Sequence, residues 1–204
     1  MSAESMEAPP ELRPLIDVLN SRRMDWRADQ LDDAGATSVM LRDSALAPHG
    51  SPVGAPDWAS TVSALRVVRD ALVQIVAEPD PDDRDRAWRT INEVAERVRL
   101  SVRLHASADG PTAELEPALD ALPGEVILAR LLTRLHDAVR AGSLRRIRLC
   151  ANPGCAVAFY DRTRSRTQRW HSYSVCGNPS NVAAYRARTR KPGPKSPYAG
   201  PRSP

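Results

Sequence analysis

The chain has 204 residues, of which 42% are hydrophobic and 26% are charged, a composition typical of a globular protein with one sizeable core. No apolar run approaches the roughly 18–20 residues that a membrane helix needs, and the acidic, Pro-rich start lacks the apolar segment of a secretory signal. We therefore expect a cytoplasmic protein. The three cysteines cannot pair fully as disulfides, and their confinement to positions 150–176 indicates a local use.

Charge divides the chain into two unequal parts. Residues 140–204 hold 14 basic residues against one acid, a net charge of +13, whereas residues 1–139 hold 15 basic and 24 acidic residues, a net charge of −9. A GC-rich genome would explain why Arg replaces Lys, but it does not explain why acids vanish from the basic end. This end therefore predicts a polyanionic partner.

Apolar residues recur at helical spacing through the first 140 residues. The pattern predicts helices over 11–23, from a Thr37 or Ser38 cap to about Leu46, over 57–77, around Trp88 and Ile91 after the break at 78–81, and over 124–140. The Pro- and Gly-rich stretch 47–56 is predicted to be a loop, and Gly142 ends the last of these helices.

One segment changes to a period of two. Val98, Leu100, Val102 and Leu104 alternate with polar residues, which predicts a half-buried strand. The dipeptide Asp109-Gly110 is typical of a turn, and Thr112–Glu116 supplies the return strand of a hairpin.

Metal-binding residue types follow an x4, x15, x4 spacing at Cys150, Cys155, His171 and Cys176. Zinc takes four thiolate or imidazole ligands in a tetrahedron, and two short-spaced pairs let each of two loops supply an edge of it. We expect a strand over Leu144–Leu149, a tight turn at Pro153-Gly154, and an outgoing strand with Val157, Phe159 and Tyr160. The alternative is a set of ordinary buried cysteines in a small domain.

This part of the chain resembles the CGNR zinc-finger family. The resemblance is carried by Arg148–Cys155, Phe159–Arg164, Arg169–Asn178 and Val182–Arg188. It implies a bacterial, cytoplasmic protein that regulates transcription. Upstream, Leu15–Arg22 is similar to the opening of the ABATE domain that usually precedes this finger, a domain with no firmly assigned ligand.

Two positions depart from the family's pattern. His171 replaces the third Cys, but a Cys3His set is a sound zinc site, so we expect zinc to be retained. Pro179 replaces an Arg, which removes one positive charge near the expected DNA surface. Asn178 is a good N-cap and Pro is tolerated at the first helical position, so the helix start is expected to survive.

Basic and amide side chains surround the ligand pairs and predict phosphate contacts, with Ser172 and Tyr173 as further hydrogen-bonding groups. The candidate nucleic-acid-binding residues are Arg162, Arg164, Arg166, Arg169, Asn178, Asn181, Arg186, Arg188 and Arg190. The alternatives are a solvated basic face without a partner and an RNA partner, although the segment has few aromatic side chains for stacking bases.

The predicted fold class is α+β, mainly α: a helical N-terminal domain with one β-hairpin, followed by a small zinc-knuckle domain with a C-terminal helix. The predicted domains are a disordered N-terminus (1–10), an ABATE-like α-rich domain (11–141), a CGNR-type zinc finger (144–190) and a disordered Pro-rich tail (191–204).

The expected function is that of a DNA-binding transcriptional regulator with structural Zn²⁺ and an N-terminal sensor or dimerisation domain. The expected partners are double-stranded DNA, a second copy of the chain and a small-molecule effector. No phosphate-binding Gly-rich loop or hydrolase motif is present, and four ligands close the zinc site, so we expect no enzyme. The alternatives are a protein-interaction module with a purely structural knuckle and a ligand-binding protein with a degenerate finger.

Overall fold

The computed structural model describes residues 8–48, 53–77, 80–108 and 110–189, with the backbone alone at 183–185 and 187–189. The elements in chain order are α1 (Arg13–Asn20), the 3-10 turn η2 (Gln30–Asp32), α2 (Ala34–Asp43), α3 (Trp58–Val76), α4 (Pro81–Ala95), β1 (Leu100–Ser107), β2 (Gly110–Pro117), α5 (Pro123–Arg140), the 3-10 turn η3 (Leu144–Arg146), β3 (Ile147–Leu149), β4 (Ala158–Tyr160), the π-turn η4 (Tyr173–Gly177) and α6 (Asn178–Thr189).

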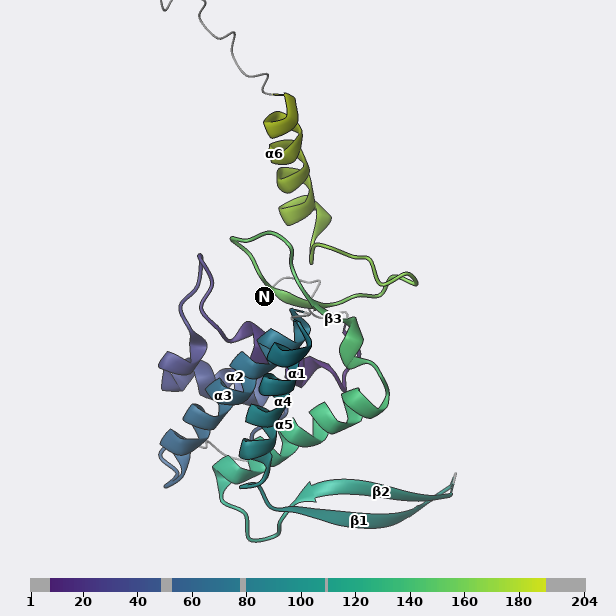
Figure 1. Cartoon of the computed structure of the whole chain (residues 1–204). Helices are drawn as coiled ribbons and strands as arrows, with labels where there is room; N and C mark the ends of the chain where they lie inside the picture. The colour runs from purple at the N-terminus through teal and green to yellow at the C-terminus, as the bar shows by residue number, and fades with distance from the viewer. Residues whose placement is uncertain (1–7, 49–52, 78–79, 109, 190–204) are drawn as a thin grey trace, which may run out of the picture.

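The predicted fold class is confirmed: a mainly helical region with one hairpin precedes a small two-stranded sheet and a C-terminal helix. Figure 1 shows α6 and the β1–β2 hairpin at opposite ends of the molecule, with the helices α1–α5 between them. No helix in the described part of the chain is long and apolar enough to cross a membrane. Of the segments predicted to be disordered, residues 1–7 and 191–204 lie outside the described residues.

The helical body is built around α1, α3 and α5, which pack against one another, while α4 packs on α3. Leucines on the facing sides of these helices are fully buried: Leu15, Leu19, Leu65, Leu72 and Leu131. Pro14 lies in the first turn of α1, where its missing N–H breaks no helical hydrogen bond. Burying each of these leucines stabilises the fold by about 1.5–3 kcal/mol.

The two strands beside the cysteines join this same core. Ile147 of β3 and Ala158 of β4 are 3% and 0% exposed and belong to the apolar cluster of the helical body. Asn20 of α1 fixes the contact, because its Nδ2 donates to the Ala158 carbonyl (2.9 Å) and its Oδ1 accepts from the Ala158 amide (2.7 Å). The guanidinium of Arg22 donates to the carbonyl of Ala156. The two predicted domains therefore share an interior.

A buried ion pair ties α3 to the loop before η2. Arg69 is 4% exposed, and it donates to Asp29 Oδ1 at 2.8 Å and to Asp70 Oδ1 at 2.9 Å. Burial by itself raises the pKa of Asp29, but hydrogen bonds from Arg69 and from the Leu31 amide outweigh it and leave that pKa below its ordinary value. The ionised pair therefore stabilises the native state.

The predicted start of the second helix is wrong. The N-cap of α2 is Asp33, whose carboxylate accepts from the Ala36 amide at 2.6 Å. Thr37 lies one turn inside the helix, where its hydroxyl donates to the Asp33 carbonyl at 2.8 Å. The Thr37 hydroxyl is thus satisfied by a carbonyl of the preceding turn, and the helix N-terminus is capped by the Asp33 carboxylate instead.

The hairpin forms in the predicted place, but its strand is not half-buried. The pairs Leu100↔Pro117, Val102↔Leu115, Leu104↔Ala113 and Ala106↔Pro111 share one face, which is apolar throughout. Yet Val102 is 66% and Leu104 is 78% exposed. The hairpin is anchored at its base, where Arg99 donates to Glu125 of α5, and its strands run on past the helical body (Figure 1). Alternation alone predicted the strand but not what covers it.

Candidate metal centre

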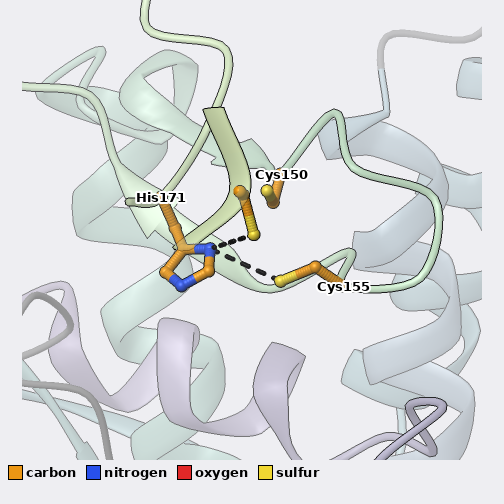
Figure 2. A group of neighbouring side chains, drawn as sticks. Cys150, Cys155 and His171 are labelled. Atoms are coloured by element: carbon orange, nitrogen blue, oxygen red, sulfur yellow. Dashed lines mark hydrogen bonds between the residues drawn. The ribbon is translucent and has the colours of Figure 1, made fainter. Parts of the chain in front are cut away.

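Four buried side chains converge at one end of the helical body. The ligand atoms of Cys150, Cys155, His171 and Cys176 all lie within 4.8 Å of one another. Cys150 follows β3, Cys155 precedes β4, His171 ends the loop after β4, and Cys176 lies in η4. Figure 2 shows the imidazole of His171 turned toward the sulfur atoms. The structure thus brings together the whole predicted ligand set.

The distances within this cluster fit a tetrahedral zinc ion. His171 Nδ1 lies 3.4 Å from Cys155 Sγ, a contact dashed in Figure 2, and 3.7 Å from Cys176 Sγ. Zinc bonded at about 2.3 Å to sulfur and 2.0–2.1 Å to nitrogen places an S–N tetrahedral edge at roughly 3.5 Å. The donor types, their number and their separation therefore fit a structural zinc with Nδ1 as the histidine ligand.

The backbone around the first two thiols is held by short hydrogen bonds. The Cys150 amide donates to the Val157 carbonyl at 2.8 Å, and the Cys155 amide donates to the Asn152 carbonyl at 2.9 Å. The side chain of Asn152 also accepts from the Gly154 amide at 3.2 Å, so the predicted turn at Pro153-Gly154 closes in this way. These bonds fix the two sulfur atoms on one side of the β3–β4 hairpin.

Burial makes the thiols of Cys150 and Cys155 poor acids in the absence of a cation. Desolvation raises the pKa of Cys150, and it is the largest cause that raises the pKa of Cys155 to about 12, with the neighbouring Cys150 and Cys176 adding to the shift. Thiolates packed this closely repel one another and are held together only by a cation. A divalent ion would bind with release of protons and would order all three sulfur-bearing segments together.

Two details of the predicted local structure are wrong. The strand expected over Leu144–Leu149 is a 3-10 turn followed by the short strand β3, because the chain must first turn back from the end of α5. Asn178 is not an N-cap: its backbone is already helical, and the helical stretch is capped earlier by Ser172, whose hydroxyl accepts from the Val175 amide at 3.3 Å. Ser172 is therefore buried in a structural role.

The single acid of the basic region organises the loop that carries its arginines. Asp161 is fully buried, and its carboxylate accepts from the Thr163 amide at 2.8 Å, the Thr163 hydroxyl at 2.5 Å and the Gln168 amide at 3.0 Å. In the sequence, Asp161 stands out only as the one acid among residues 140–204. Its position at the end of an apolar strand, with Thr163 two residues further on, is the signal that was available for this role.

The predicted nucleic-acid-binding residues surround this centre. Arg162, Arg164, Arg166 and Arg169 are exposed on the loop between β4 and His171, and Asn178, Asn181 and Arg186 are exposed on α6. The guanidinium of Arg169 lies 5.2 Å from the ring centroid of Trp170, which packs against the cysteine cluster. Arg190 and the side chain of Arg188 lie outside the described residues.

A short antiparallel hairpin, a Cys3His cluster and a following helix define a zinc finger whose metal site is structural. Residues 146–189 match the CGNR zinc finger family, so this segment carries a CGNR zinc finger with a Cys3His metal site. No curated protein matches the chain.

Proposed function

We propose that this protein binds double-stranded DNA through its finger and thereby regulates transcription in the cytoplasm of a bacterial cell. The observation that carries the proposal is the arrangement of four exposed arginines, Arg162, Arg164, Arg166 and Arg169, on a loop whose ends are fixed by Asp161 and the metal site. Guanidinium groups held on a rigid scaffold suit phosphate contact, since little side-chain and loop entropy is lost on binding.

In this proposal α6 provides the groups that read the DNA sequence. It projects from the finger beside η4, and Asn178, Asn181 and Arg186 are exposed on it (Figure 1). Amide side chains distinguish bases by paired hydrogen bonds in the major groove, whereas the loop arginines supply affinity without sequence information.

The helical body, which we assign to the ABATE type, is proposed to carry the sensing function. A cavity of about 780 Å³ lies between α1, α2 and the finger, and its walls include Met40, Phe159 and the exposed ring of Trp26. Ligand sites commonly have this size and an apolar lining, and they often lie between two parts of a protein. A small-molecule effector bound there would contact both the helical body and the segment that carries Cys155.

A second copy of the chain is the partner that we propose for the hairpin. Its apolar face is formed by four cross-strand pairs and is most exposed at Val102 and Leu104, and a two-fold axis would set this face against itself in a self-complementary contact. A two-stranded hairpin with one apolar side needs such a cover, because it is only marginally stable alone in water. We propose no catalytic role for the chain.

Salt-dependent duplex binding by the full, zinc-loaded chain tests the DNA proposal. If about four to six phosphates are neutralised, log affinity falls with log salt at a slope of roughly −4 to −5. Changing Arg164 and Arg169 to Gln should flatten the slope by about 0.9 for each lost contact, while Asn181→Ala should alter preference between sites more than overall affinity. Absence of a duplex complex at about 50 mM salt would favour the protein-interaction alternative.

A further inference from the structure

A second groove separates the helical body from the finger and is lined by arginines. It has a volume of about 810 Å³ and lies where the ends of α3 and α5 meet the finger. Its cationic residues come from different places in the chain: Arg84, Arg140, Arg145, Arg148 and Arg166. Its remaining walls are mainly apolar and include Trp88 and Ile75, and no acidic residue lines it.

The fold places these arginines together by turning sharply after α5. Gly142 has φ +66°, a left-handed conformation that favours glycine. A Cβ atom at this position would lie 2.7 Å from Nη2 of Arg145, and the Nε of Arg145 donates to the Gly142 carbonyl at 3.2 Å. This turn sets Arg145 beside Arg140, the last residue of α5.

The finger contributes the opposite wall. Nη1 of Arg148 on β3 donates to the Arg166 carbonyl at 3.2 Å, which joins the arginine-rich loop to the strand. Arg166 also belongs to the exposed arginines proposed to bind DNA. The groove is therefore continuous with the proposed DNA surface of the finger.

Three of the five arginines that line the groove have no ion-paired carboxylate among the described residues. Among the described residues, Arg140, Arg145 and Arg166 form no ion pair within 4.0 Å. The carboxylate of Asp161, whose pKa Arg148 helps to lower, is buried among its own hydrogen-bond donors. Several like charges around one groove repel one another, and a bound anion relieves that repulsion. The part of the helical body that lines this groove is thus basic, although residues 1–139 carry a net charge of −9.

We propose that this groove holds phosphate groups of the same nucleic-acid backbone that the finger binds, so that the helical body forms part of the DNA interface. The inference rests on the proposed function and adds residues that the sequence did not indicate, above all Arg84 of α4 and Arg140 of α5. Guanidinium groups pair with phosphate oxygens in a bidentate manner and keep their charge at every physiological pH. The helical body then strengthens duplex binding, in spite of its acidic composition.

The test compares two double variants of the full, zinc-loaded chain. Arg84→Gln with Arg140→Gln removes two charges from the groove, and Arg89→Gln with Arg134→Gln removes two exposed charges from the same two helices outside it. The groove variant should lower the magnitude of the salt slope by about 1–2 and weaken duplex binding by about tenfold or more at low salt. The control variant should leave the slope as in the wild type.

The other outcomes separate this inference from the proposed function. If Arg164→Gln with Arg169→Gln weakens duplex binding but the groove variant behaves like the control, the groove inference fails and DNA binding stands. If the wild type binds no duplex, the proposed function fails and this inference fails with it. Calorimetric titration with inorganic pyrophosphate is the last test. If pyrophosphate binds saturably, if only the groove variant loses this binding, and if pyrophosphate does not compete with duplex, the groove binds a small phosphorylated ligand and the inference is overturned.

Discussion

The helical body and the finger are held together by different physical means. The body buries a continuous apolar cluster over α1, α3, α4 and α5, whereas the finger has a much smaller cluster in which three cysteines pack with Phe159, Val157 and Trp170. A core this small supplies little of the free energy that ordering the chain costs, so the finger depends on its metal. The body depends on side-chain packing spread over many residues. Stability should thus be lost in separate ways in the two regions.

Loss of a zinc ligand is the change with the largest expected effect. His171→Ala should abolish stable zinc binding and unfold the segment from Cys150 to Gly177, because structural zinc sites contribute about 10–16 kcal/mol of apparent binding free energy. Metal analysis together with hydrogen exchange should show lost protection there and retained protection in α3. His136→Ala is the matched control, since His136 is exposed on α5 and its Nδ1 lies 3.0 Å from Asp137 Oδ1. Zinc bound at full stoichiometry by the His171→Ala variant would contradict the ligand assignment.

A cavity in the helical core should destabilise the helical body and leave zinc binding intact. Leu131 is fully buried, so Leu131→Ala should lower the free energy of unfolding by about 2–5 kcal/mol. Urea denaturation measures the change, and zinc content should stay at one ion per chain under native conditions, because no ligand is touched. Val67→Ala, at a more exposed position on α3, is the control and should cost far less. Zinc loss in step with the Leu131→Ala destabilisation would mean that the two regions do not separate.

The buried ion pair of Asp29 and Arg69 should make the stability of the helical body depend on pH in the acid range. Because the pKa of Asp29 in the folded chain lies below its ordinary value of 3.8, its stabilising contribution is present above that pH and is lost as the pH falls through the folded-state pKa. Asp29→Asn should lower the free energy of unfolding by about 3 kcal/mol at pH 7, since it leaves the charge of Arg69 buried with Asp70 alone.

Urea denaturation between pH 3 and pH 7 checks both statements about this pair. Asp33→Asn is a suitable control, because its side chain is an exposed N-cap that an amide also serves well. An equal loss in both variants, or an unchanged acid limb of the pH curve for Asp29→Asn, would contradict the role given to the ion pair.

The link between the two regions is the next target. Asn20→Ala removes both hydrogen bonds to Ala158 and leaves its amide and carbonyl without these partners, which should cost about 1–3 kcal/mol. The effect should appear as weaker protection of Ala158 against hydrogen exchange, with zinc still bound. Asn92→Ala, on the exposed side of α4, provides the comparison and should change little. Equal protection in the two variants would show that the apolar contact of Ile147 suffices to join the regions.

The elements of the body could be predicted because each satisfies a local rule. Leu65, Leu72 and their neighbours repeat at helical spacing and are buried, and Gly142 ends α5 as its freedom at positive φ allows. The metal cluster could be predicted because its ligand spacing is a property of the chain alone. Neither the periodicity of apolar residues nor the ligand spacing predicts which other elements pack beside a given helix or strand. The convergence of Arg84 with Arg145 depends on the tertiary path of the chain, and so does the burial of Ala158 against Asn20.

The hairpin is where local pattern and tertiary environment diverge most, and it carries the smallest expected effect on the monomer. Leu104→Ser should change the free energy of unfolding by no more than about 0.5 kcal/mol at low protein concentration, because the side chain is already largely in water. If a second copy covers this face, the same substitution should abolish dimerisation and the dependence of the melting temperature on concentration. Sedimentation equilibrium of the wild type, Leu104→Ser and a polar-face control, His105→Ser, separates the two cases. A wild type that stays monomeric at high concentration would leave the apolar face without the proposed partner, and a dimer that tolerates Leu104→Ser would place the interface elsewhere on the molecule.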